Sequence, residues 1–408
     1  MKKFELLAPA GNFPSMIAAV NAGADAVYFG LKEFSMRDSA KNFSIKDLDK
    51  ISKICGNTKS YKALGCPKNE KHFFGVKRYL ALNTIIYDNE LKKIEGIIEK
   101  VKGKVDAIIC WDYSVMQLCR KYKIPFHIST QASVANSASA EFYKKLGAER
   151  IVLARELNLA QIKKISKIID VECFVHGAMC VSISGRCFTS QFLESRSANR
   201  GECLQPCRRS YIIKDENGNE LKLENNKVMS AKDLCALPFI EKLKNAGISA
   251  FKIEGRNRSP EYVRTTVQIY RKALDKKLSK EEIKESLEQL KAVYNRGFSS
   301  GFYLGLPTSD DFSGTEDGEA KERKIVLGTI EKYWPKISVA ALKINSNHLK
   351  LGDEIYIIGK SSGISRVKVS RIEINHKPIA LAEKGMLVGI KAPKCQKGDE
   401  VFLIEKNI

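Results

Sequence analysis

The stretch NAGADAVYFG (residues 21–30) ends a helical pattern with a glycine and passes at once into a short apolar run. The same order recurs in KLGAERIVLA (145–154) and NAGISAFKIEG (245–255). Glycine readily takes the left-handed conformation that ends a helix, and an apolar run without alternation is typical of a strand buried on both faces. The repeat therefore predicts helices that lead into the strands of a parallel sheet.

Eight buried runs of this kind are found along the chain. They lie at 4–8, 26–29, 79–82, 107–110, 125–129, 150–153, 171–175 and 250–253. Segments with helical apolar spacing separate most of them, for example 45–55, 89–101 and 158–169, and further helices are expected over about 260–294. This alternation predicts an α/β fold, a TIM-type (β/α)8 barrel, with a doubly wound open sheet as the alternative.

The chain has 408 residues, more than one compact domain usually holds. We assign 1–307 to the barrel, with a long cysteine-rich loop at 176–227 before the eighth strand and a shorter insertion at 56–75. The polar stretch 308–324 has the composition of a linker. From 325 to 408 short β-branched strands alternate with turns, which predicts a small C-terminal β-barrel.

The net charge and composition of the chain indicate which kinds of partner it can bind. The chain carries 69 Lys and Arg against 47 Asp and Glu, a net charge of +22 that attracts polyanions such as nucleic acid, although lysine-rich solvated faces explain it equally well. Glu5, Pro9 and Gly11 interrupt the amino-terminal apolar residues, so they do not form a signal peptide, and no run reaches the ~20 apolar residues of a membrane span. We expect a cytoplasmic protein with no membrane partner.

Cysteines give the sharpest chemical signal. Four lie in the loop at 176–227 and a fifth lies on SAKDLCAL, where we expect a helix to begin: Cys180, Cys187, Cys203, Cys207 and Cys235. Clustered thiolates suit an iron–sulfur cluster or zinc, and the absence of a Cys-x-x-Cys pair favours the cluster. The remaining cysteines are assigned to the core (Cys55, Cys110, Cys119 and Cys173) or left without a role (Cys66 and Cys395).

Reacting groups in a (β/α)8 barrel follow the carboxyl ends of the strands. The polar residues in such places are Asn83, Asp112, Ser129, Thr130, Gln131, Arg155, Glu156, His176, Glu254 and Arg256. We expect Arg155 and Glu156 to converge with Glu254 and Arg256 on one small anionic ligand, whose carboxylates the arginines hold. A salt-bridge network that merely closes the barrel is the alternative.

The cysteine-rich loop is also basic and aromatic. It carries Arg186, Arg196, Arg200, Arg208 and Arg209 among Phe188, Phe192 and Tyr211. Guanidinium groups and aromatic rings suit phosphate contact and base stacking on single-stranded RNA, so we predict Arg186, Arg200, Arg208 and Arg209 as RNA contacts. An ordinary solvated loop explains the composition nearly as well.

The segment VECFVHGAMCVSISGRCFTSQFLESRSANRGECLQPCRRSY (171–211) resembles the signature of peptidase family U32, and SAFKIEGRNRSPEYV (249–263) resembles the second hallmark of that family. Further likeness in LLAPAGNFPSMIAAVNAGADAVYFG, FHISTQASVAN, LGAERIVLARELNL and NRGFSSGFY extends it over about 1–306. The C-terminal unit is similar to the β-barrel of the RNA-hydroxylating branch, and in turn to the second domain of elongation factor Tu.

This resemblance implies that Cys180, Cys187 and Cys203 hold an iron–sulfur cluster, of the 4Fe-4S type, with either Cys207 or Cys235 as the fourth ligand. It implies an enzyme that hydroxylates a pyrimidine in tRNA or ribosomal RNA, with prephenate as a co-substrate, and an oligomer, either of this chain alone or with a paralogue. The 56–75 insertion departs from the family pattern, and its Cys66 has no recognised counterpart, which leaves the branch open.

Two other functions compete with RNA hydroxylation. The family name implies a peptidase or collagenase, but the sequence lacks a His-Glu-x-x-His helix and a Gly-x-Ser-x-Gly elbow, which leaves a Cys–His dyad built on His176. The other alternative is a non-enzymatic scaffold that binds RNA and uses its cluster structurally.

Overall fold

The computed structural model describes residues 4–37, 40–56, 75–212, 214–219, 229–315 and 318–407. Eight parallel strands form the first unit: β1 Glu5–Pro9, β2 Ala26–Gly30, β3 Lys77–Ala81, β4 Ala107–Cys110, β5 Phe126–Ile128, β6 Arg150–Val152, β7 Asp170–Gly177 and β9 Ala250–Ile253. Strands β1 to β7 pair in chain order, and β9 pairs in parallel with both β7 and β1, which closes the ring. The predicted TIM-type barrel is confirmed, and the open-sheet alternative is wrong.

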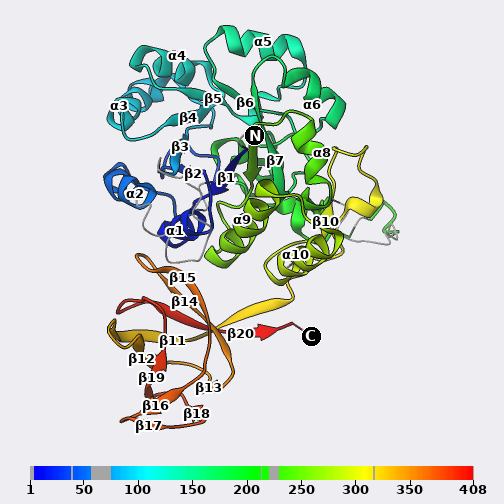
Figure 1. Ribbon diagram of the computed structural model, residues 1–408. Coiled ribbons are helices and arrows are strands. Elements are labelled where there is room, and N and C mark those ends of the chain that lie inside the picture. The colour runs from blue at the N-terminus through cyan, green and yellow to red at the C-terminus, as the bar shows by residue number, and fades with distance from the viewer. Residues whose placement is uncertain are drawn as a thin grey trace.

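Helices surround this barrel (Figure 1). They are α1 Phe13–Asn21, α2 Leu48–Cys55, α3 Leu91–Val101, α4 Tyr113–Tyr122, α5 Ser137–Lys145, α6 Leu159–Ile165, α8 Ile240–Asn245, α9 Pro260–Asp275 and α10 Lys280–Ala292. Gly23, Gly147 and Gly247 end α1, α5 and α8 with φ of +99°, +99° and +85°. Only glycine takes this conformation without strain, so the repeat quoted above marks three helix-to-strand turns correctly. None of the helices in the described ranges combines the length and apolar composition needed to cross a bilayer.

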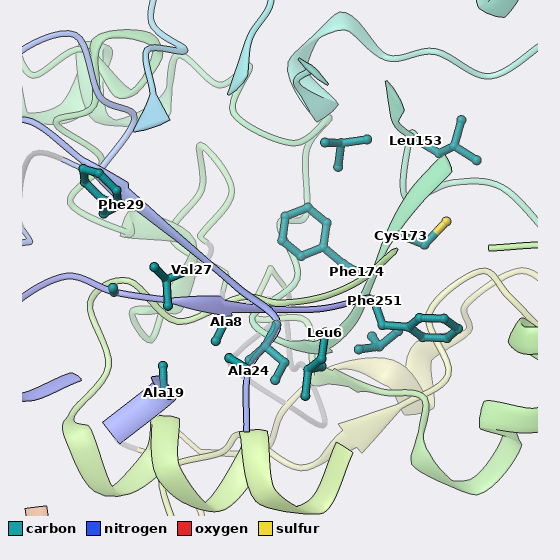
Figure 2. Close-up of a cluster of buried hydrophobic side chains, with 14 of the residues drawn as sticks. Leu6, Ala8, Ala19, Ala24, Val27, Phe29, Leu153, Cys173, Phe174 and Phe251 are labelled. Atoms are coloured by element: carbon teal, nitrogen blue, oxygen red, sulfur yellow. The ribbon is translucent and has the colours of Figure 1, made fainter. Parts of the chain in front are cut away.

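Alternate residues of each strand face opposite sides of the sheet. Leu6 and Ala8 of β1 join Ala19 of α1 in the hydrophobic core between strands and helices (Figure 2). Leu7 belongs instead to a separate cluster with Tyr28 and other side chains of β2, β3 and β4, inside the barrel. This half of the interior is therefore apolar.

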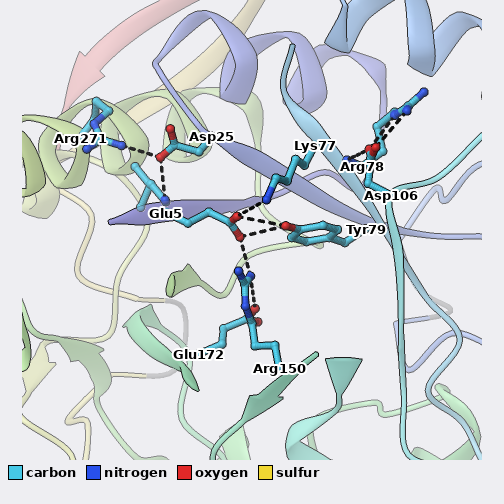
Figure 3. A network of polar contacts seen from close by, with 10 residues as sticks. Glu5, Asp25, Lys77, Arg78, Tyr79, Asp106, Arg150, Glu172 and Arg271 are labelled. Carbon is cyan, nitrogen blue, oxygen red and sulfur yellow. Dashed lines mark hydrogen bonds and ion pairs between the residues drawn. The ribbon is translucent and has the colours of Figure 1, made fainter. Parts of the chain in front are cut away.

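Charged side chains fill the other half of the barrel interior. The Arg150 guanidinium on β6 donates to Glu5 at 2.5 Å and lies 3.4 Å from the Glu172 carboxylate on β7 (Figure 3). Glu172 is fully buried and also accepts from the Lys252 ammonium on β9 at 2.8 Å. Two cations thus share one buried carboxylate, and the network joins β1, β6, β7 and β9.

The mouth of the barrel carries an extra piece of sheet. Strand β8 (Asp233–Cys235) pairs antiparallel with the end of β7, and β10 (Phe298–Ser299) pairs with β8. The expected helix start at Cys235 is wrong, because backbone pairing of Cys235 with His176 extends the sheet there and the next helical turn begins at Leu237. The loop before β8 contains a short helix, α7 Thr189–Glu194. Most of the 56–75 insertion, with Cys66, lies outside the described residues.

The C-terminal unit is an antiparallel sheet. Its strands are β11 Glu322–Trp334, β12 Val339–Ile344, β14 Glu354–Gly359, β15 Gly363–Lys368, β16 Ile372–Ile374, β17 Lys377–Pro378, β19 Leu387–Lys391 and β20 Glu400–Lys406, with a separate ribbon of β13 Leu349–Lys350 and β18 Leu381–Ala382. This unit has its own hydrophobic core, between Leu327 and Leu403. In the stretch predicted as a linker, the Ser313 amide donates to the Ser230 carbonyl at 2.6 Å, so that part of the chain is attached to the barrel.

The charged interior gives a stability prediction. Glu172→Gln should lower the free energy of unfolding by about 3 kcal/mol, because it leaves the buried Lys252 and Arg150 without their shared counter-charge. The matched control is Glu33→Gln, which removes the half-exposed pair with Lys93 and should cost less than about 1 kcal/mol. Urea denaturation followed by circular dichroism measures both, and equal shifts would contradict the network's structural role.

Candidate functional site

A polar pocket opens at the mouth of the barrel, where the carboxyl ends of the parallel strands meet. Its polar lining comes from the loops or ends of most of the strands: Tyr28, Arg37, Asn83, Ser129, Thr130, Gln131, Arg155, Cys180, Ser184, Lys252, Glu254 and Arg256. The prediction that polar groups after several strands converge is met by Gln131, Arg155, Glu254 and Arg256. The chemical role of each group stays a prediction.

Glu254 is the centre of charge in this pocket. Burial alone would raise the pKa of its carboxyl, but Arg37, Arg155, Arg256 and Lys252 together outweigh burial and hold the pKa at about 2. Arg37 is the nearest, with its Nε 3.4 Å from a carboxylate oxygen. Glu254 is therefore ionised at neutral pH and holds several cations around one small space.

Each of the two predicted arginines, Arg155 and Arg256, has one N–H donor that pairs with no described residue. Arg256 is buried, which lowers its pKa to about 10, and its Nη1 donates to the Ser35 hydroxyl at 2.5 Å. Arg155 donates from Nη1 to the Ala178 carbonyl at 2.7 Å and lies over the Phe174 ring. The Nε atoms of both arginines are buried without a hydrogen-bond partner among the described residues. An unpaired buried donor is costly, so these two N–H groups are suited to the oxygens of a bound anion.

Sequence reasoning missed Arg37. It lies seven residues beyond Gly30, the last residue of β2, in a loop whose course the local pattern does not define. In the structure its pKa is raised, first by Glu254 and then, against the effect of burial, by Cys180 and Cys203. The charge of Arg37 therefore interacts with both the carboxylate of the pocket and the thiols of the cysteine-rich loop.

A hydrogen-bonded row of uncharged groups forms the opposite wall. Gln131 accepts from the Ser129 hydroxyl, and the Asn83 amide donates to the same hydroxyl at 3.3 Å. A Cβ atom on Gly185 would lie 2.8 Å from the Gln131 side chain, so the glycine lets the cysteine-rich loop approach this wall closely.

Two predicted catalytic residues lie elsewhere. Glu156 is exposed and does not line the pocket, because the chain turns outward directly after Arg155. His176 is fully buried among the rings of Tyr262, Tyr270 and Phe298, and burial, together with Arg258, lowers its pKa to about 3. The expectation that Glu156 joins the converging set is wrong, and His176 is a neutral core residue behind the pocket.

Four thiols of the long loop lie near one another. The pKa of Cys207 is raised, first by burial and then by the neighbouring thiols of Cys180, Cys203 and Cys187. Partial burial also acts on Cys187, but hydrogen bonds involving Thr189 and the Ser182 side chain outweigh it and lower the pKa of that thiol. In the described parts of the chain no three His, Cys, Asp or Glu side chains are arranged to bind a single metal ion. The thiols of Cys180, Cys187 and Cys203 therefore act electrostatically on Cys207, and in the described residues the four are not arranged around one metal position.

Cys235 is separate from this group. It lies on β8, buried, with its Sγ 3.7 Å from the Tyr270 hydroxyl, and burial raises the pKa of the thiol to about 11. The acidic group that also raises the pKa of this thiol is Asp233, and not a thiol of the loop. Of the two candidates for a fourth ligand, Cys207 is the one that accompanies the other three.

The predicted RNA contacts divide into two kinds. Arg208 is buried and donates to the carbonyls of Met179 and Ala231, each at 2.5 Å. Arg200 forms a bidentate ion pair with Glu90. These contacts hold the cysteine-rich loop in place. Arg186 and Arg209 are exposed, and they contact the Trp111 ring and the Glu194 carboxylate, respectively. The assignment of these four arginines to RNA stays a prediction.

Comparison with known proteins identifies the family. Residues 11–312 match the model of peptidase family U32. The chain is 39% identical to an uncharacterized protease of Methanocaldococcus jannaschii, over the full length of both, and 37% identical to a collagenase of Porphyromonas gingivalis, over 99% of this chain and 98% of the other. It is 33% identical to tRNA hydroxylation protein P1 of Bacillus subtilis, over 88% and 84% of the two chains. The chain therefore belongs to peptidase family U32.

Proposed function

We propose that this protein is an iron–sulfur enzyme that hydroxylates a pyrimidine base in RNA, with tRNA as the first candidate substrate. The observation that carries the proposal is the position of the loop thiols. Cys180 lines the same pocket as Arg155, Glu254 and Arg256, and Arg37 connects the two groups electrostatically. The relative named for tRNA hydroxylation supports the substrate class, as does the net charge of +22.

The donor set fits an iron–sulfur cluster. Cys180, Cys187, Cys203 and Cys207 would hold it, and four thiolates are the usual ligands of a 4Fe-4S cluster. A cluster contains several irons bridged by sulfide, so its protein ligands stand further apart than those of one zinc ion, in keeping with the absence of a single-ion site in the described residues. The cluster would supply the electron transfer that a hydroxylation needs and amino-acid side chains lack.

The pocket residues would bind a small organic acid, for which prephenate is our candidate. Arg155 and Arg256 present unpaired Nε donors to its carboxylates, and the Glu254 charge keeps the Arg37 side chain in position. Lys252, a buried residue of the pocket lining, pairs with Glu172 and lies over the Tyr28 ring, 4.4 Å from its centroid. These groups would orient the acid beside the RNA base and exclude water from it.

Proteolysis is disfavoured by the state of His176, on which the candidate Cys–His dyad with a loop cysteine is built. A thiolate–imidazolium pair needs a thiol of lowered pKa beside a histidine that accepts a proton. His176 is buried among the rings of Tyr262, Tyr270 and Phe298, and burial, together with Arg258, lowers its pKa to about 3. The ring is therefore a weak base, and its Nδ1 atom lies 3.4 Å from the Tyr270 hydroxyl.

Cluster content separates the two candidate ligands. Cys207→Ala should lose most of the iron and the brown colour of protein purified without oxygen, because three thiolates hold a cluster weakly. Cys235→Ala is the matched control and should keep both, since its buried thiol contacts the Tyr270 hydroxyl. Iron and sulfide analysis with absorption spectroscopy measures this, and loss of iron in the control alone, or colourless wild-type protein with stoichiometric zinc, would refute the assignment.

The anion clamp is tested by Arg256→Lys. Lysine keeps the positive charge but loses the planar donor fork, so RNA modification in cells should fall ~10- to 100-fold, the worth of one hydrogen bond to a charged group. Iron content should stay normal. Arg323→Lys, on the exposed pair with Glu405, is the control and should modify RNA normally. Wild-type modification by Arg256→Lys would remove this residue from the clamp.

Peptidase activity should be absent from the pure protein. We expect no cleavage of gelatin or casein above background, and any residual cleavage should be equally present in His176→Ala, because a contaminant would cause it. Strong cleavage by the wild type that this substitution abolishes would reverse the choice of function.

A further inference from the structure

A second cavity, which we call the interdomain groove, lies between the barrel and the C-terminal sheet. Its volume is about 860 Å³. Residues 12–14, 40–43 and 256–260 line it from the barrel, and residues 358–361, 396–400 and 402 line it from the sheet. The barrel segments all follow the carboxyl ends of strands, so the groove is on the same side of the barrel as the mouth.

The two units that form the groove are in direct contact. A Cβ atom on Gly363 of β15 would lie 2.5 Å from the Ile17 side chain of α1, and the Lys324 ammonium pairs with Glu261 of α9 at 2.9 Å. Figure 1 shows β15 and β14 of the C-terminal sheet beside α1. The barrel and the C-terminal sheet therefore pack against each other beside the groove.

The lining of the groove is positively charged. Lysines enter it from both units, namely Lys41 from the barrel and Lys324, Lys360 and Lys397 from the C-terminal unit. Lys324 and Lys397 have acidic partners, but Lys41 and Lys360 form no ion pair with any described residue. Two carboxylates also line the groove, the exposed Glu400 and the buried Asp399, which accepts from the Ser362 hydroxyl at 2.6 Å and the Gln396 amide at 2.8 Å. With Arg256 and Arg258, six basic side chains of the lining stand against these two.

Aromatic rings lie among these lysines. Phe13 at the start of α1 and Phe402 on β20 line the groove from opposite sides, and both are partly exposed. Lys50 lies over the Phe13 ring and Lys324 lies over the Phe402 ring. A groove that combines basic side chains with partly exposed aromatic rings suits a single-stranded nucleic acid, whose phosphates bind the cations and whose bases stack on the rings. An acidic protein segment would use the basic side chains but not the rings.

The groove and the pocket share one lining residue, the buried Arg256. The residues that follow it, 257–260, also line the groove. We propose that the interdomain groove binds the phosphate backbone of a single-stranded segment of the substrate RNA and so directs its target base into the barrel mouth. This inference rests on the proposed function, because it assigns the surface that the RNA would occupy. It adds that RNA recognition requires both structural units.

The test compares two doubly substituted proteins with the same change in charge. Lys41→Glu with Lys360→Glu reverses the two unpaired groove lysines. Lys377→Glu with Lys384→Glu reverses two exposed lysines of the same C-terminal unit that lie outside the groove. The probe is unfractionated tRNA, its binding measured by fluorescence anisotropy over a series of salt concentrations, with iron content as the check that both proteins are intact.

The groove variant should bind tRNA at least ~10-fold more weakly, and the slope of log affinity against log salt should fall by about 1.4, for two single-strand phosphate contacts. The control variant should change by less than ~3-fold, because its charges lie outside the contact and are screened beyond about 10 Å at 0.1 M salt.

The outcomes distinguish this inference from the proposed function. If the wild type binds no tRNA, the proposed function fails and the groove assignment fails with it. If the wild type binds but the groove variant binds equally well, or both variants weaken alike, the groove assignment alone is wrong. Displacement of tRNA by polyglutamate as effectively as by unlabelled tRNA would show that the groove takes an acidic protein segment instead.

Discussion

The buried Glu254 carboxylate is the interaction on which the site depends. Its charge is surrounded by Arg37, Arg155, Arg256 and Lys252, which come from three different parts of the barrel. Without a central anion these cations would repel one another across a small buried space. Lys252 pairs with Glu172, Glu172 also pairs with Arg150, and Arg150 pairs with Glu5. The charged groups of the mouth and of the barrel interior therefore form one network in which cations and carboxylates alternate.

The cations around Glu254 also interact with the cysteine-rich loop. Arg37 responds to both Glu254 and the thiols, so the loop lies against a surface that is already positive. Arg200 attaches the middle of the loop to the barrel through Glu90, and Arg208 joins it to the carbonyls of Met179 and Ala231, near the two ends of the loop. Placement of the thiols is thus a result of the fold rather than of the loop sequence alone.

The fold was largely predictable from the sequence, and the site was predictable in part. Unbroken apolar runs and left-handed glycines are local signals, so all eight barrel strands were found within two residues of their ends. Arg155 and Arg256 follow strands closely and turn inward, whereas the adjacent Glu156 turns outward, which spacing alone does not reveal. Arg37 and the separation of Cys235 from the loop thiols depend on how distant segments pack. Lys252 and Glu172 were hidden within apolar strands, where only the alternation of the closed barrel turns them inward.

The central claim is that this protein adds oxygen to an RNA base, and the nucleosides of cellular RNA test it most directly. Mass spectrometry of digested RNA should be performed on cells that lack the gene and on the same cells with the gene restored. The account predicts one pyrimidine nucleoside, heavier than its parent by one oxygen atom, that disappears without the gene and returns with it. An identical set of nucleosides in both samples would contradict the account.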